Sequence, residues 1–228
     1  MALAAAFALA LPPAANAGEA SRLAPGFTAR APGSTLVVVP PDLELYSISA
    51  GGVTEPRADW TEAAQRHFRA ALATRREAFG PPPRELSARD LDELDDLNAL
   101  HGAVAESIFM HHVVGGNWRL PTKRESLDWS LGDAVEPLRR KSGADYALFL
   151  WIRDSYASSE RKAAMVAMAL FGVGLAGGAQ VGYASLVDLR DGRVVWFNDL
   201  RRPRGDLREA GAAAETLEAL LMGFPSAP

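Results

Sequence analysis

An uncharged run separates two stretches of this chain that are both typical of β-strands. The run covers residues 163–179 and has the sequence AAMVAMALFGVGLAGGA. Before it lies DYALFLWIR (145–153), and after it lies QVGYASLVDLR (180–190), which ends on an Asp191-Gly192 turn. A domain in water normally buries so apolar an insert, because exposed apolar surface costs about 25 cal/mol per Å². The place where this run is covered is therefore the main question that the sequence raises about function.

Three placements of the run are open. A membrane-spanning helix needs about 17 residues or more, which the run only just reaches, and its many Ala and Gly residues add little hydrophobicity. A helix packed on the chain's own sheet suits the composition better. A contact with another subunit is the third placement, because Gly174 and Gly178 would let a second backbone approach closely. The candidate contact residues are Met165, Met168, Leu170, Phe171, Gly174 and Gly178.

The other elements predict a single α/β domain over residues 35–224, with the apolar insert at 160–179. Two β-rich runs, broken by Pro40-Pro41, predict one bent strand over 36–48. The Asp191-Gly192 turn predicts a C-terminal β-hairpin. Apolar residues spaced at about 3.6 predict helices over 58–79, 87–114, 133–141 and 206–222. We therefore expect a mixed β-sheet that is covered by helices.

Turn and cap residues set the expected ends of these helices. Ser87 and Asp133 are positioned to cap the second and third helices, and Gly143 follows the third. Asp206 and Glu209 have the spacing of a capping box and predict the start of the last helix.

The first residues predict export from the cytoplasm. Residues 1–17 are uncharged and end in Ala-Asn-Ala, which is typical of a signal peptide cleaved after Ala17. Residues 18–34 are rich in Ala, Pro and Gly and predict a flexible lead-in. The 228-residue chain has no cysteine, which excludes disulfides, thiolate metal sites and a lipid-modified lipobox cysteine. We therefore expect a periplasmic protein, with association with the outer membrane as a further option although the chain has no lipobox cysteine.

Charge argues against a nucleic-acid partner. The formal net charge is −4, and the densest basic cluster, at 201–204, is flanked by Asp199 and Asp206. A nucleic-acid-binding domain carries a concentrated basic surface instead.

Two patterns resemble cofactor or metal motifs but lack the context that those motifs need. Residues 172–177 have G-x-G-x-x-G spacing, which binds dinucleotides only where it follows a strand and opens a helix. Here helix-forming residues precede the glycines and a strand follows. His101, His111 and His112 share one predicted helix but lack the i, i+4 spacing of a helical metal pair. We predict no catalytic residues, no cofactor and no metal, and hence a non-enzymatic protein.

Several turn and strand segments carry a resemblance to a known family. They are GADY at 143–146, LVDL at 186–189 and GRVVW at 192–196, together with the strand at 36–41, GDLR at 205–208 and LMGFP at 221–225. The chain resembles uncharacterised Gram-negative envelope lipoproteins of the superfamily that contains the curli secretion-channel lipoprotein and the TolB amino-terminal domain. The resemblance implies a three-layer α/β domain at the outer membrane that serves envelope assembly or secretion. The curli channel carries a membrane-entering β-hairpin where this chain has its Ala- and Met-rich insert, which lacks the alternation of a barrel strand.

The leading hypothesis is a non-enzymatic periplasmic scaffold or accessory subunit of an envelope assembly or secretion complex. Its partner would be an envelope protein or a second copy of the chain, and a peripheral contact with a membrane is a further option. The alternative is a binding domain for a small ligand or peptidoglycan fragment, with Trp118, Trp129 and Trp151 as stacking groups. A third hypothesis, a hydrolase that uses the histidines, would require a bound metal.

Overall fold

The computed structural model describes residues 22–75, 79, 86, 90, 94–123, 126–203 and 205–226. The predicted signal peptide and Ser87, the predicted cap of the second helix, lie outside the described residues. The strands are β1 (Leu36–Val38), β2 (Asp42–Ile48), β3 (Thr54–Pro56), β4 (Tyr146–Ala157), β5 (Gln180–Asp188) and β6 (Val194–Arg202). The α-helices are α2 (Ala58–Thr74), α4 (Asp95–Ile108), α5 (Glu136–Ser142), α6 (Ser159–Ala169) and α7 (Ala210–Leu220). The π-helix η2 (Phe109–Val114) extends α4, and short 3-10 helices cover η3 (Gly116–Trp118), η4 (Pro121–Lys123) and η5 (Gly132–Val135).

The strands form a mixed sheet in the order β3-β2-β4-β5-β6, with β1 also paired to β4. β4, β5 and β6 are antiparallel, whereas β1 and β2 run parallel to β4. At Pro40-Pro41 the chain takes four steps from Val38 to Asp42 while β4 takes three from Leu148 to Trp151. The extra residue is a bulge at a proline pair, where the backbone cannot donate to the ladder. The mixed sheet and the bent first strand are therefore confirmed.

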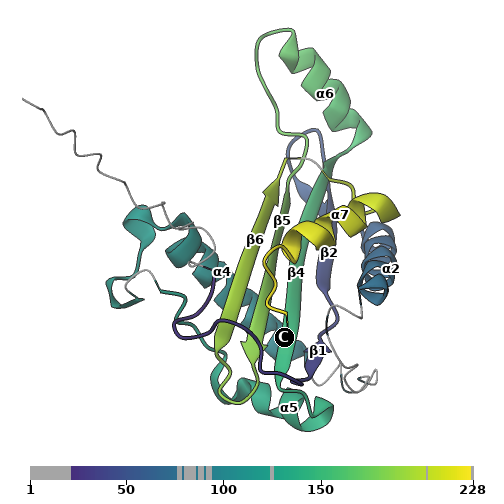
Figure 1. Ribbon diagram of the computed structural model, residues 1–228. Coiled ribbons are helices and arrows are strands. Elements are labelled where there is room, and N and C mark those ends of the chain that lie inside the picture. Colours follow the sequence, from purple (N-terminus) through teal and green to yellow (C-terminus); the bar gives the residue numbers. More distant parts are fainter. Residues whose placement is uncertain are drawn as a thin grey trace, which may run out of the picture.

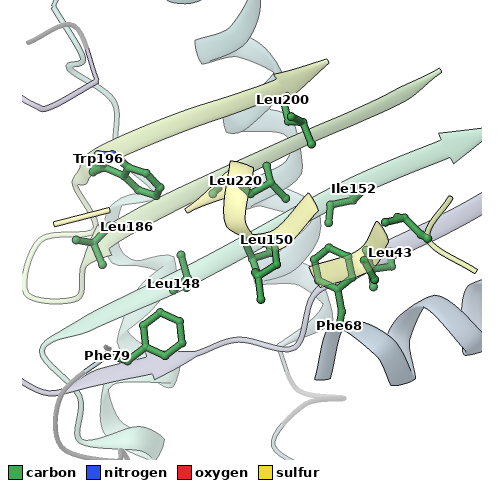
Figure 2. Close-up of a cluster of buried hydrophobic side chains, with 14 of the residues drawn as sticks. Leu43, Phe68, Phe79, Leu148, Leu150, Ile152, Leu186, Trp196, Leu200 and Leu220 are labelled. Atoms are coloured by element: carbon green, nitrogen blue, oxygen red, sulfur yellow. The ribbon is translucent and has the colours of Figure 1, made fainter. Parts of the chain in front are cut away.

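Helices cover both faces of the sheet and make the predicted three layers (Figure 1). α2 and α7 pack on one face, and α4, η2 and α5 pack on the other. Side chains alternate along β4, so Leu148 and Leu150 face α2 and α7, while Phe149 faces α4. Figure 2 shows Phe68 of α2 and Leu220 of α7 beside the first set. Because β4 is buried on both faces, most of its sequence is a continuous run of apolar residues.

The predicted hairpin closes one end of the sheet. Gly192 has a φ of +70°, and a Cβ there would lie 2.3 Å from the carbonyl oxygen of Gly132. Leu131 N donates to Gly192 O at 2.8 Å, and Val194 N donates to Trp129 O at 2.9 Å. The turn is thus tied to the chain segment that precedes η5, and only glycine fits at its second position. We call this end of the sheet the hairpin end.

The helix ends differ in part from the prediction. The described part of α2 ends at Thr74, and α4 begins at Asp95, within the predicted range. α7 begins at Ala210 and not at Asp206, so the predicted capping box is wrong. The Asp206 carboxylate accepts from Arg208 N at 3.1 Å and pairs with the Arg208 guanidinium, which holds this segment as a turn.

The described part of the N-terminal lead-in lies against the domain. Leu23 bridges Trp196 on β6. Arg30 is buried, and its guanidinium donates to Pro225 O at 3.1 Å and to Phe79 O at 3.0 Å. These contacts hold residues 22–30 on the fold, in a stretch where the sequence predicts flexibility.

Candidate functional site: an exposed arm between two central strands

The apolar run forms an arm that connects β4 to β5. Ser158 caps α6, because its hydroxyl accepts from Arg161 N at 3.2 Å. The chain turns back at Gly172, whose φ is +73°, and residues 173–179 return to β5. Figure 1 shows α6 projecting beyond the end of the sheet, opposite the hairpin end. We call residues 158–179 the arm and this end of the sheet the arm end.

Backbone hydrogen bonds that extend the β4–β5 pairing hold the arm where its two branches leave the sheet. We call this part of the arm its root. Ala157 N donates to Gly177 O at 2.7 Å, and Ser155 N donates to Ala179 O at 3.1 Å. Arg161 adds a bond from its Nε to the carbonyl of Ala176 at 2.9 Å. The two branches of the arm are therefore fixed to each other at the root.

The outer part of the arm, around Leu170 and Phe171, exposes large apolar side chains, and we call it the tip. Leu170 is 83% exposed, Phe171 is 80% exposed and Val166 is 68% exposed. Met168 and Val173 are exposed as well. No charged residue occurs between 163 and 179, so this surface is uncharged as well as apolar. Exposed apolar clusters on a soluble domain mark interaction surfaces.

The prediction that the run packs on the chain's own sheet is wrong. None of the residues of α6 is buried. The helix instead packs on the returning branch of its own arm, where the end of the Met165 side chain lies against Gly177. Because 158–179 continues the line of the β4–β5 pair, it has no sheet face to cover. Among the helices that the structure describes, none combines the length and hydropathy needed to cross a bilayer.

The six candidate contact residues do not share one role. Met168, Leu170, Phe171 and Gly174 are exposed. Met165 is half-buried inside the arm. Gly178 is a structural residue of the root: its φ is +145°, and a Cβ there would lie 2.0 Å from the carbonyl oxygen of Ser155.

The glycines of 172–177 do not form a phosphate-binding loop. They follow α6 and lead into β5, so they do not open a helix as a dinucleotide-binding loop must. Gly172 serves the turn at the tip, and Gly177 gives room to Met165.

A buried polar network lies directly beneath the arm, on the face covered by α2 and α7. Asp154 of β4 and Gln180 of β5 face each other across the root, and Gln180 Nε2 donates to Asp154 Oδ2 at 2.8 Å. The hydroxyl of Tyr156 also donates to Asp154 and accepts from Leu207 N at 2.8 Å. Gln180 Oε1 accepts from the hydroxyl of Thr216 on α7 at 3.1 Å. The network joins both branches of the arm to α7 and to the turn before it.

Burial gives this network an unusual carboxyl group. Asp154 is only 2% exposed, and burial raises its pKa to about 6, although the hydrogen bonds from Tyr156 and Gln180 act in the opposite direction. Sequence reasoning missed this site because Asp154 and Gln180 stand 26 positions apart. A signal was present, since a carboxylate and an amide stand on either side of the uncharged run, at the ends of two largely apolar strands.

The predicted helix places its histidines in different surroundings. His101 is buried, with its ring stacked on Phe149 at 4.6 Å and its Nε2 2.9 Å from the hydroxyl of Ser185. Burial lowers the pKa of His101 to about 3. His111 is half-exposed and bonds the carbonyl of Trp118. Ser185 is fully buried, so the His101–Ser185 pair offers no hydroxyl to a substrate.

The three tryptophans proposed as stacking groups differ in their surroundings. Trp151 stacks on Tyr183 at 5.1 Å and has the Arg153 guanidinium 4.4 Å from its ring centre. Trp129 stacks on His111 at 6.2 Å and packs against the core beneath α4. Trp118 is 59% exposed. Two of the three rings are thus already stacked within the protein. Within the described residues, no group of three or more His, Asp or Glu side chains is arranged to hold a metal ion.

The fold and the arm define a three-layer α/β domain with an exposed apolar extension. No family model and no curated protein matches the chain. Among solved structures, it is similar to PelC from Paraburkholderia phytofirmans, described as a dodecamer, with 14% identity, coverage of 87% of this chain and 92% of that chain, and a TM-score of 0.37.

Two further solved structures overlap in a similar way. The C-terminal domain of LpoB from Salmonella enterica has 15% identity, coverage of 79% and 88%, and a TM-score of 0.29. Lipoprotein GNA1162 from Neisseria meningitidis has 17% identity, coverage of 83% and 94%, and a TM-score of 0.36. Overlaps with TM-scores below 0.5 are too loose to transfer a function or an assembly state. The superfamily named above therefore stays a prediction.

Proposed function

We propose that this protein is a non-enzymatic accessory subunit of a cell-envelope assembly, exported to the periplasm, and that the arm is its contact with a neighbouring subunit. The observation that carries the proposal is the exposure of Leu170 and Phe171 at the tip of a firmly rooted arm. Full burial of a Leu or Phe side chain contributes roughly 1.5–3 kcal/mol. A subunit that covered the tip would remove this exposed surface.

The neighbour that the arm fits best is a second copy of the chain. Two copies of a charged surface repel each other unless their charges are offset. Residues 163–179 carry no charge, so two arms can meet without this repulsion. The exposed Gly174 adds a place where two backbones can approach closely. A bilayer is a poorer neighbour, because residues 173–179 form no helix and are in no strand, and irregular backbone is costly in hydrocarbon.

The test is the oligomeric state of the purified protein, measured by size-exclusion chromatography with light scattering over a range of concentrations. We expect the wild type to self-associate and the double variant Leu170→Ser/Phe171→Ser to be monomeric. The matched control is Val53→Ser/Met222→Ser, which removes two apolar side chains that are 62% and 61% exposed outside the arm. This control should associate like the wild type.

Co-sedimentation with phosphatidylcholine vesicles and with vesicles that contain anionic lipid distinguishes a contact between copies from a contact with a membrane. We expect no vesicle binding that depends on the tip. A wild-type protein that stays monomeric at every concentration would overturn the proposed contact between copies. If vesicle binding were then lost in the tip variant, the arm would be a membrane contact instead.

A further inference from the structure

The carboxyl group of Asp154 lies where both branches of the arm enter the sheet. It is the last residue of β4 to face β5 in the strand register, opposite Gln180. Directly beyond this pair come the two hydrogen bonds of the root, from Ser155 N and from Ala157 N. The Asp154–Gln180 contact is therefore next to the backbone hydrogen bonds that hold the arm to the sheet.

The surroundings of Asp154 leave little room for adjustment. A Cβ on Gly205 would lie 2.8 Å from Nε2 of Gln180, so the turn before α7 presses directly on the network. Gln180 is 1% exposed and Thr216 is fully buried. The Asp154 carboxyl, with only 2% of the residue exposed, is therefore shielded from water in the closed root.

The charged and titratable groups around Asp154 come from β4, from the turn before α7, from α2 and from α6, whose Lys162 helps to lower the pKa of Asp206. Tyr156, on the same strand, donates to the carboxyl. Asp206, in the turn before α7, raises the pKa of Asp154, and Arg208 pairs with Asp206 and stacks on Tyr156 at 4.2 Å. On α2, the ring of His67 bonds the backbone carbonyl of Arg208. The facing residues of β2, β5 and α7 are the neutral Leu45, Gln180 and Thr216.

We propose that Asp154 makes the arm root responsive to pH: the root stays closed while the carboxyl carries its proton, and loss of the proton promotes opening. An ionised carboxylate in this closed space has lost most of its hydration, and opening of the root restores it. The inference rests on the proposed function in one respect, namely that the arm presents the contact surface. The opening itself is a property of the isolated chain.

The expected size of the pH effect follows from the difference in the pKa of the Asp154 carboxyl between the closed root and the open, solvated root. Its pKa is about 6 in the closed root, and a solvated Asp has its ordinary value of 3.8. The equilibrium constant for opening should then increase about tenfold from pH 5 to pH 8 and level off above about pH 6.

Hydrogen exchange of the monomeric protein tests this inference, measured by mass spectrometry on peptides that report the amides of Ser155 and Ala157. Rates are corrected for the pH dependence of exchange in the unfolded chain. We expect protection at the root to fall about tenfold between pH 5 and pH 8 in the wild type. In Asp154→Asn, a neutral side chain of the same shape, protection should not change with pH.

Two further variants keep the test decisive if Asp154→Asn does not fold. Tyr156→Phe removes a donor to the carboxylate, so the change should level off at a higher pH than in the wild type. Asp199→Asn is the matched control, because this carboxylate on β6 is partly exposed and pairs with Arg201 away from the network. It should keep the wild-type profile.

Protection that is independent of pH in the wild type would overturn the inference. So would a pH-dependent profile that survives in Asp154→Asn or that is unmoved by Tyr156→Phe. The proposed function fails separately: tip variants that associate like the wild type would remove the contact but leave a pH-responsive root intact. If both proposals hold, self-association of Asp154→Asn should lose its pH dependence.

Discussion

The two ends of the sheet differ in how they join their strands, although β5 reaches both. At the hairpin end, Asp191-Gly192 turns tightly and is bonded to residues 129–131. At the arm end, residues 158–179 leave the sheet and expose their apolar tip. The hairpin end is thus tied to the rest of the fold by backbone hydrogen bonds, whereas the arm end leaves apolar surface in water. This difference indicates that the hairpin end maintains the fold and that the arm end is free to interact.

The segments that carry the family resemblance lie mostly at the hairpin end, and their contacts are structural. Asp145 of the GADY segment accepts from Thr35 N at 2.8 Å and so fixes the start of β4 to β1. Asp188 pairs with Arg190 beside the hairpin turn. These residues stabilise the fold, while the residues proposed to make contacts lie at the opposite end.

The largest effect is expected from a Cβ at the hairpin turn. Gly192→Ala combines a φ of +70° with a clash against the backbone of Gly132, so we expect a loss of roughly 3 kcal/mol in the free energy of unfolding. Gly172→Ala at the arm tip is the matched variant, with a φ of +73° but open space around it. Its loss should be about 1 kcal/mol. Urea unfolding followed by circular dichroism measures both, and equal losses would contradict the contrast between the two ends.

The second prediction concerns pH, which should act in opposite directions on His101 and Asp154. The pKa of His101 is about 3 when folded and ordinarily 6.5, so its stabilising effect is lost as the pH falls from 6.5 toward 3. The pKa of Asp154 is about 6 when folded and ordinarily 3.8, so acidification through this window stabilises the folded state. Between pH 7 and pH 4.5 we expect a loss of about 3 kcal/mol from His101 and a gain of about 2 kcal/mol from Asp154.

Urea unfolding at pH 7 and pH 4.5 separates these two groups. Asp154→Asn should lose more stability on acidification than the wild type, because only the His101 effect remains. His101→Gln should become more stable on acidification. The assignment of these two groups would be wrong if both variants followed the wild-type change.

The third prediction compares two glycines that the sequence places in one candidate surface. Gly178→Ala should break the root, because its Cβ would clash with the Ser155 carbonyl, and hydrogen exchange at Ala157 should become faster. The cost in global stability should be about 1–2 kcal/mol, since the core lies away from the root. Gly174→Ala has open space and no positive φ, so its stability should change by less than about 0.5 kcal/mol. Equal protection of Ala157 in both variants would contradict the structural role of Gly178.

The sequence was a good guide where local chemistry decides the structure. Hydrophobic alternation and the Asp-Gly turn predicted the sheet and the hairpin, and Pro40-Pro41 predicted the break between β1 and β2. The predicted capping box at Asp206 is wrong because the Asp206 carboxylate pairs with the charged side chain of Arg208, two residues away. A local pattern cannot rank these two partners without the three-dimensional position of Arg208.

The candidate site was predictable only in part, for a related reason. The run at 163–179 was recognisable as unusual from its composition, but its exposure depends on the direction in which β4 and β5 end. The Asp154 network depends on strand register, which brings together residues from both sides of the run and from α7. Periodicity within one segment contains no information about such a long-range contact.

The smallest effect is expected at the arm tip. Leu170 and Phe171 touch little of the fold, so Leu170→Ser/Phe171→Ser should change the free energy of unfolding by less than about 0.5 kcal/mol in monomeric protein. Urea unfolding at a concentration below the onset of association measures this, with Leu148→Ser as the contrasting variant because Leu148 is fully buried in the core. A tip variant that lost several kcal/mol would show that these side chains pack on the domain. A neutral tip that abolishes association would instead show that the arm end keeps its apolar residues for a neighbour, whereas the hairpin end uses its residues for folding.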